Sequence, residues 1–512
     1  MSEASLDAAP QPRPAMPGAD TVPDSAGAVV AALSAAADAA AAEALHPPPP
    51  PPTPPAGPAF VPPYPPRPPR LLPLPDFLRA LRRSFLDIWP QPSFERAFIH
   101  RRVLMRDIYI CNSPETVQQA FVDQPAAFER KSPQMRHALR PLLGDGLFIS
   151  DGPLWKERRR VVAPVTHVSR LAALTPPITE AAAERASAWT ARPAGQPIDM
   201  LAEMGHLTAE IICRTIFGRQ LGGSAAATVV GAFAEYQRVV GQTDLISLLG
   251  LPDWVPRWQP LRARRAGQRI QRVLDRLIDD ILDGPADGEA SLIRAMAEGV
   301  NPRTGKRMDK AAFRNEAAVL FMAGHETTAN TLAWAWYLLS QSPAVLARLQ
   351  AEADALDGPA RFADMARLPY TRAVVEETLR LYPPVPLLAR EAVTEGEIGG
   401  RQIRKGSLVL AVPWLLHRHR LLWQAPDAFW PERFLPGGEA ASKPRYTWIP
   451  FAIGPRVCTG AAFGLTEAVL CLATLARAVT PRLAPGAVVY PVCRLTLRPG
   501  DSLPMLLEKR HG

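Results

Sequence analysis

Cys458 is the residue of this chain whose surroundings indicate chemistry most clearly. It lies in Phe451-Ala-Ile-Gly-Pro-Arg-Val-Cys-Thr-Gly460, two residues after Arg456, and an apolar helical pattern runs from Ala461 to Ala476 behind it. A helix N-terminus and a nearby arginine favour an anion, so we expect this position to stabilise thiolate over thiol. A tetrahedral zinc site is disfavoured because no second cysteine or histidine follows at close spacing. A single loop thiolate instead suits one axial position of a haem iron.

The same loop resembles the haem-binding signature of the cytochrome P-450 haem-thiolate monooxygenases, Phe-x-x-Gly-x-Arg-x-Cys-x-Gly. All specified positions match, namely Phe451, Gly454, Arg456, Cys458 and Gly460. The resemblance implies that Cys458 ligates haem iron and that Phe451 shields the thiolate from water. The two glycines would let the backbone approach a flat ring. The alternative is a small buried cysteine in a tight turn, and the number of matched positions weighs against it.

A polar stretch, Ala323-Gly-His-Glu-Thr-Thr328, interrupts the apolar helical pattern from Ala312 to Leu339. Glycine and threonine are poor helix-interior residues, and an acid among apolar neighbours needs a reason. One reason is a local distortion in which a threonine hydroxyl takes over a backbone hydrogen bond. The stretch resembles the distal-helix signature of the same family, which implies that Thr327 and Glu326 relay protons for dioxygen activation and that Gly324 leaves room over the iron. The alternative is an exposed polar notch in a core helix.

Two further segments match the family in order along the chain. Glu377-Thr-Leu-Arg380 lies inside a helical pattern from Leu368 to Tyr382, where residues three apart share a face and can pair. It matches a Glu-x-x-Arg motif, and Pro431-Glu-Arg-Phe434 resembles the family's next segment. The resemblance implies a buried network of Glu377, Arg380 and Arg433 that braces the loop bearing Cys458. An ordinary pair on a surface helix is the alternative.

The haem propionates would need cations or hydrogen-bond donors. Trp155-Lys-Glu-Arg-Arg159 resembles a Trp-x-x-x-Arg segment of the family, which makes Trp155 and Arg159 candidates. Arg390 follows a helix-to-strand turn where a further propionate arginine is expected, and Arg456 belongs to the cysteine loop itself. For each arginine a surface salt bridge is the competing interpretation. The remaining alternatives are Arg158, Arg160 and His137.

Composition divides the chain into a tail and a body. Residues 1–57 are rich in alanine and proline and hold six acids against one arginine, a net charge of −5. We expect this segment to be disordered, because it cannot build a packed core. Residues 58–512 are expected to form the haem-thiolate monooxygenase domain; since the total charge is +9, they carry +14. The 5 scattered cysteines do not suggest a disulfide framework, so a reducing compartment is expected.

The resemblance implies a mostly helical α+β fold, the cytochrome P-450 fold. It would be a single large helical domain with small β-sheets, and the haem would lie buried between a distal and a proximal helix. Direct reading of the patterns predicts long helices at 178–217, 261–282 and 312–356. It predicts short β-rich runs at 103–110, 408–412 and 488–497. The apolar stretch 27–45 carries Asp38 and Glu43 and is a poor membrane span.

Function follows from the resemblance: insertion of one oxygen atom of O2 into a C–H bond, with haem b as the cofactor. The pocket walls are expected to be apolar, which favours a fatty acid, lipid or terpenoid as substrate. The candidate wall residues are Phe148, Leu248, Ala323, Leu387 and Leu388.

Electrons are expected from a separate ferredoxin or flavodoxin-like donor with its reductase, because the chain has no dinucleotide-binding loop. We expect that donor to dock near Lys443, Arg445 and Arg456, where a basic body suits an acidic carrier. No nucleic-acid groove and no transmembrane segment are predicted, and a bacterial cytoplasmic protein is expected. The alternatives are a haem-thiolate peroxygenase or isomerase, and a non-catalytic haem- or ligand-binding protein. The Glu326-Thr327 pair argues against the first of these.

Overall fold

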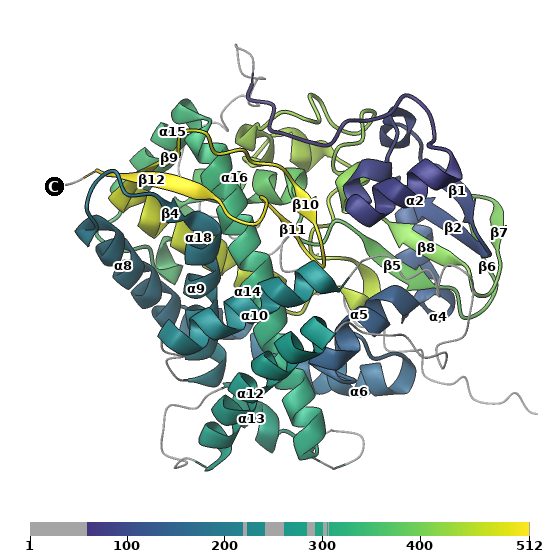
Figure 1. Cartoon of the computed structure of the whole chain (residues 1–512), viewed down its shortest axis with the longest axis horizontal. Helices are drawn as coiled ribbons and strands as arrows, with labels where there is room; N and C mark the ends of the chain where they lie inside the picture. The colour runs from purple at the N-terminus through teal and green to yellow at the C-terminus, as the bar shows by residue number, and fades with distance from the viewer. Residues whose placement is uncertain are drawn as a thin grey trace, which may run out of the picture.

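The computed structural model describes residues 59–510, apart from 219–222, 241–260, 284–291, 301–304 and 306. Figure 1 shows helices gathered on one side of the molecule and the larger sheet, with α2, on the other. The predicted N-terminal tail and the stretch 27–45 lie outside the described residues. The mostly helical fold with small sheets is as predicted.

The helices differ greatly in length. The long ones are α8 (Pro176–Ala191), α9 (Met200–Ile212), α10 (Gly223–Val239), α12 (Leu261–Asp283), α14 (Lys310–Ser340), α15 (Pro343–Asp354), α16 (Pro369–Leu381) and α18 (Ala461–Ala478). The shorter ones are α2 (Leu74–Arg83), α3 (Pro114–Gln118), α4 (Pro125–Phe128), α5 (Pro133–Leu143), α6 (Gly152–Val162), α7 (Leu171–Leu174), α13 (Leu292–Glu298) and α17 (Pro413–Leu416).

The largest sheet carries part of the predicted site. Its strands, in spatial order, are β1 (Phe98–Val103), β2 (Arg106–Cys111), β8 (Leu408–Ala411), β5 (Leu388–Glu391) and β3 (Arg130–Lys131). Only β2 and β8 pair in parallel. Since β5 lies between β8 and β3, Leu388 and Arg390 are fixed in a strand bonded on both sides.

Three small sheets complete the β-structure of the described residues. They pair β4 (Ile198–Asp199) and β9 (Val479–Leu483) with β12 (Pro504–Lys509), β6 (Gly396–Ile398) with β7 (Arg401–Ile403), and β10 (Val492–Cys493) with β11 (Leu497–Arg498).

Two predicted long helices are each interrupted. The pattern 178–217 is not one helix, because α8 ends at Ala191 and the proline- and glycine-containing segment 192–197 leads into strand β4 before α9 begins. The pattern 312–356 is divided between α14 and α15 at Gln341 and Ser342, directly before Pro343. Proline lacks the N–H that a helix interior needs and starts a new helix readily, which explains the second break. The predictions of single helices at 261–282, 368–382 and 461–476 are confirmed by α12, α16 and α18.

The β-rich runs are also shorter than predicted. The run 103–110 is a hairpin rather than one strand, since Leu104 adopts a left-handed φ of +53° between β1 and β2. The run 488–497 forms strands only at β10 and β11. The run 408–412 is confirmed by β8.

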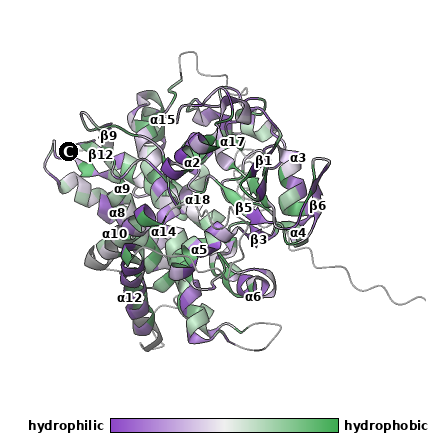
Figure 2. Cartoon of the chain, turned by 45° about the vertical axis from the view of Figure 1, so that its right-hand side comes forward, coloured by the Kyte–Doolittle hydropathy of each residue, from purple (hydrophilic) through white to green (hydrophobic). Residues whose placement is uncertain are grey.

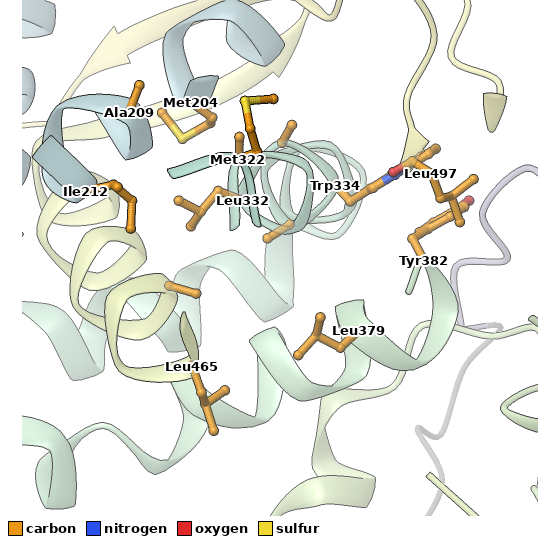
Figure 3. Packing of buried hydrophobic residues seen from close by; sticks show 14 of the residues in the cluster. Met204, Ala209, Ile212, Met322, Leu332, Trp334, Leu379, Tyr382, Leu465 and Leu497 are labelled. Atoms are coloured by element: carbon orange, nitrogen blue, oxygen red, sulfur yellow. The ribbon is translucent and has the colours of Figure 1, made fainter. Parts of the chain in front are cut away.

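Helix α14 crosses the centre of the core. Figure 3 shows it almost end-on, with side chains pointing outward towards α9, α16 and the residues of β11. Trp334 is fully buried and stacks on Tyr382 with ring centroids 3.6 Å apart. A Cβ atom on Gly324 would lie 2.4 Å from Cδ1 of Ile212 on α9. Gly324 therefore permits the close approach of two helices, and it also lines the cavity described below.

Helix α12 is amphipathic and α18 is apolar. Figure 2 shows a strongly hydrophilic surface along α12, whose buried face includes Ile270 and Leu274. Among the described residues, α18 is the one helix long and apolar enough to cross a membrane, and 83% of it is buried inside the protein. Its apolar sequence is therefore explained by its place in the core.

Candidate active site

A large internal cavity lies between α14 on one side and the Cys458 loop with the start of α18 on the other. The space in it that is open to the centre of a water molecule is about 240 Å³. Most of the predicted site residues line it, although they come from distant parts of the chain. They are Phe148, Trp155, Arg159, Ala323, Thr327, Leu387, Leu388, Arg390, Phe451, Arg456, Cys458 and Gly460.

The Cys458 loop is held in shape by its backbone. The Cys458 N–H donates to the Phe451 carbonyl at 2.9 Å, and Arg159 Nη1 donates to the Val457 carbonyl at 2.7 Å. Gly454 has a left-handed φ of +65°, and a Cβ there would lie 2.1 Å from the carbonyl oxygen of Phe121. Gly454 therefore permits the turn and its packing, and does not itself line the cavity.

Cys458 lies deep in the protein, yet its side chain is accessible because it faces the cavity. Burial raises the pKa of the Cys458 thiol, against a hydrogen bond from the Gly460 N–H and the positive charges of Arg159 and Lys131. The Gly460 N–H and Arg159 thus favour the thiolate as expected, and burial opposes them. A coordinated metal ion would reverse this balance, because a ligating thiol is deprotonated outright.

One edge of the cavity holds an excess of buried positive charge. Burial lowers the pKa of Arg390 to about 9 and that of Arg456 to about 10, and it lowers the pKa of Lys131 well below its ordinary value. Asp151 is the carboxylate bonded to this group: it accepts from Arg456 Nη2 and from the Lys131 N–H, each at 3.0 Å. Asp151 and Glu129 are the carboxylates that act on Arg390 and Arg456, so the three basic groups outnumber the acids and this edge of the cavity suits an anionic ligand.

The residues fit the propionate edge of a haem. Arg456 is buried and stacks over the Trp155 ring at 4.4 Å, yet its Nε and Nη1 atoms have no hydrogen-bond partner. Unpaired buried donors are costly, and two carboxylates would satisfy them. Among the described residues no group of three His, Cys, Asp or Glu could hold a metal ion, which leaves Cys458 as a single protein ligand. That donor set suits a macrocycle-bound iron.

The alternative propionate candidates lie elsewhere. Arg158 is buried but turns towards Asp145 and Glu316. Arg160 is exposed, and His137 does not line the cavity.

The two predicted relay residues face different surroundings. Thr327 lines the cavity, and its hydroxyl donates to the Ala323 carbonyl at 2.7 Å. Glu326 does not line the cavity. Its Oε1 atom accepts three hydrogen bonds, from Gln237 (2.9 Å), Asn330 (3.0 Å) and Thr496 (2.8 Å). Consecutive residues lie about 100° apart round a helix, and here the Glu326 side chain turns towards α10 while Thr327 faces the cavity.

The electrostatics of Glu326 suit an ionised group. Burial raises the pKa of its carboxyl, but Arg498, His325 and the hydrogen bonds outweigh burial and hold the pKa below its ordinary value. Glu326 is thus a buried carboxylate that joins α14 to Gln237 on α10 and Thr496 beside β11.

Glu377, Arg380 and Arg433 lie together with no exposed surface. Arg380 binds Glu377 through two hydrogen bonds of 2.6 and 2.8 Å, and Arg433 Nε donates to Glu377 at 3.1 Å. Arg380 also donates to the His417 carbonyl at 2.8 Å, and His417 Nε2 accepts from the Ile449 N–H at 2.8 Å. The network therefore reaches the segment that enters the Cys458 loop.

Some site residues were missed from the sequence. Lys131 lines the cavity with its ammonium 4.4 Å from the Phe148 ring centre, and Asp151 binds the Arg456 guanidinium. Neither belongs to a recognisable motif, and Asp151 is separated from Arg456 by 305 residues. Of the predicted wall residues, Leu248 lies outside the described residues.

Comparison with known proteins identifies the family. The Cytochrome P450 family model matches residues 93–488, and the chain belongs to this family. It is therefore an oxidoreductase of the monooxygenase type that uses haem iron and dioxygen. A cyclooctatin synthase of Streptomyces melanosporofaciens is 33% identical over 86% of this chain and 94% of the relative.

Two further similarities support the assignment. A cyclooctat-9-en-7-ol 5-monooxygenase of the same organism is 31% identical over 78% of this chain and 86% of the relative. The crystal structure of a cytochrome P450DA heme domain has a TM-score of 0.70 at 24% identity and covers 81% of this chain and 90% of that chain. The structural likeness shows the fold.

Replacing Glu377 by Gln should destabilise the protein by roughly 3–5 kcal/mol, because the buried Arg380 loses its charge partner and the buried Arg433 keeps only Glu439. Urea unfolding monitored by fluorescence measures the change. Arg348→Gln is the control, since it removes an ion pair with Glu432 in which Arg348 is 53% exposed and should cost less than about 1 kcal/mol. Equal effects of the two substitutions would contradict the account of the network.

Proposed function

We propose that this monooxygenase hydroxylates a C–H bond of an apolar, terpenoid-sized molecule. The observation that carries the proposal is the cavity wall on the α14 side, which is apolar apart from threonine hydroxyls. Its residues include Leu147, Phe148, Val319, Ala323, Leu387 and Leu388. Two relatives named for the cyclooctatin series support a cyclic hydrocarbon or its alcohol over a fatty acid.

In this proposal the haem is haem b and Cys458 is its protein ligand. Arg456, Arg390, Arg159, Lys131 and Trp155 would hold its propionates, since they line the same edge of the cavity. When bound, the haem supplies dioxygen activation and oxygen-atom transfer; the protein supplies orientation and electrostatics.

The chain's own groups would control water and protons on the other side. The apolar wall orients the substrate by shape and excludes water. The Thr327 hydroxyl would hold a proton on its oxygen. The Ala323 carbonyl orients this hydroxyl by accepting its hydrogen bond. For Glu326 to supply protons, its carboxylate would have to leave Gln237 and Thr496. Our proposal that Glu326 supplies protons therefore includes this movement of its carboxylate.

Electrons would come from a separate ferredoxin or flavodoxin-like protein with its reductase. Of the predicted docking residues Lys443, Arg445 and Arg456, Arg456 needs correction, because it is buried and bonded to Asp151. A surface hollow reaches Cys458 from the side of α6 and is lined by Arg159, Arg160, His167 and Thr459. We place the donor there. Relatives from Streptomyces also support the proposal of a bacterial cytoplasmic protein.

Substrate class is tested by adding cyclooctat-9-en-7-ol, its parent hydrocarbon or dodecanoate to the protein with a surrogate ferredoxin and reductase. We expect the cyclic compounds to shift the haem absorption and to gain one oxygen atom by mass spectrometry. Oxidation of dodecanoate alone would contradict the substrate class.

Replacing Thr327 tests its role in proton delivery. Thr327→Ala should raise peroxide release per NADPH consumed by about tenfold, whereas Thr327→Ser keeps the hydroxyl and should couple normally. Unchanged coupling in Thr327→Ala would contradict the role of Thr327.

Charge reversal at the hollow tests the docking site. Arg160→Glu should slow reduction by the donor by about tenfold at low salt and weaken its dependence on salt, because steering by opposite charge is lost. Stopped-flow reduction measures the rate. Arg82→Glu on α2, also an exposed arginine, is the matched control and should leave the rate unchanged. Equal rates in both variants would rule out this face.

A further inference from the structure

The loop Gly144–Ser150, called here the 144–150 loop, contributes Leu147 and Phe148 to the cavity wall. It follows α5 directly: Gly144 has φ of +55° and its N–H closes the helix by donating to the Arg140 carbonyl at 2.9 Å. A Cβ on Gly146 would lie 2.7 Å from Val319 Cγ2 on α14. The loop backbone is therefore pressed against α14, where only glycine fits.

One buried carboxylate holds this loop to α14. Glu316 has no exposed surface, and its two oxygens both accept from the Leu147 N–H, at 2.9 and 3.0 Å. Burial raises the pKa of Glu316 to about 7, while the Leu147 N–H and Arg158 favour the charged form. An acid in this apolar place is costly unless it is bonded, so its contacts explain its presence.

Arg158 on α6 joins the loop and the helix. Its guanidinium lies 3.5 Å from Glu316 Oε1 and 3.5 Å from Asp145 Oδ1 in the loop. Asn315, beside Glu316 on α14, donates to the same Asp145 at 2.7 Å. Two consecutive residues of α14 therefore hold two residues of the loop, and Arg158 bridges both contacts.

The same helix stripe also forms the substrate wall. Val319, Leu320 and Ala323 follow Glu316 by three, four and seven residues, which places all four on one face of α14, and these three line the cavity. A fixed Leu147 backbone also fixes the Cα atom of the next residue, Phe148, from which that side chain extends. We propose that Glu316 is a positioning residue for specificity: its carboxylate, held by Arg158, clamps the 144–150 loop to α14 and so sets where Phe148 stands over the substrate cavity.

The inference rests on the proposed function only in taking this cavity as the substrate site. The test compares Glu316→Leu and Glu316→Gln in the haem-loaded protein. The matched control is Glu352→Leu, since Glu352 likewise accepts backbone N–H groups, from Tyr370 at 2.8 Å and Thr371 at 2.7 Å, and does not line the cavity. Hydrogen exchange of the 144–150 peptide and absorption titrations with imidazole and 4-phenylimidazole are the readouts.

Loss of the clamp should free the Leu147 amide. We expect exchange in the 144–150 peptide of Glu316→Leu to be at least about tenfold faster, with an intermediate rate for Glu316→Gln, whose amide oxygen still accepts from Leu147. The dissociation constant of 4-phenylimidazole, which is large enough to reach the wall, should change by about fivefold or more, and that of imidazole by less than about twofold. Glu352→Leu should alter neither readout.

Unchanged loop exchange and an unchanged ratio of the two dissociation constants in Glu316→Leu would overturn the proposal. If Glu316→Leu does not fold, the same two results in Glu316→Gln overturn it. Failure of the haem site itself would look different: neither imidazole would then shift the absorption of the unsubstituted protein, and hydrogen exchange alone would decide whether Glu316 clamps the loop.

Discussion

Unbalanced positive charge inside the protein is the constraint on which the site depends. Lys131, Arg390 and Arg456 lie at one edge of the cavity, where Asp151 is bonded to the Arg456 guanidinium and to the backbone N–H of Lys131. Taking a charge out of water costs several kcal/mol, so an arrangement of this kind requires an anion to complete it. A haem provides two carboxylates at one edge and an iron that a single thiolate can ligate. The cations and Cys458 thus select the same ligand by independent chemistry.

Contacts elsewhere in the fold hold the buried cations and the Cys458 loop in position. Glu377 binds Arg380 and Arg433, and through His417 the network reaches the segment leading to Cys458. Gly454 lets the loop turn against Phe121. On the other side, α14 presents Thr327 to the cavity and Glu316 to the 144–150 loop. Helix α14 thus carries both the proposed proton-handling hydroxyl and the contact that we propose to shape the wall.

Features made of residues close together in the sequence were predicted best. The loop around Cys458 and the helix behind it are each one continuous segment of the chain, and the structure places the loop at the cavity. Contacts between distant segments were not predictable, because Asp151 and Arg456, or Glu316 and Leu147, have no shared pattern in the chain. The different directions of the Glu326 and Thr327 side chains follow from helical geometry, but the residues that Glu326 contacts come from α10 and the segment beside β11.

The breaks in the predicted helices have a local origin. Apolar residues flank the segment 192–197 on both sides, but the two prolines and the glycine within it determine the backbone.

The most direct test of the account is the absorption difference spectrum of the dithionite-reduced protein with carbon monoxide, recorded beside Cys458→Ala. Thiolate ligation by Cys458 predicts a strongly red-shifted Soret band that is lost in the variant. The same band position in both proteins would contradict ligation by Cys458, and the absence of any haem band would contradict the assignment of the cavity.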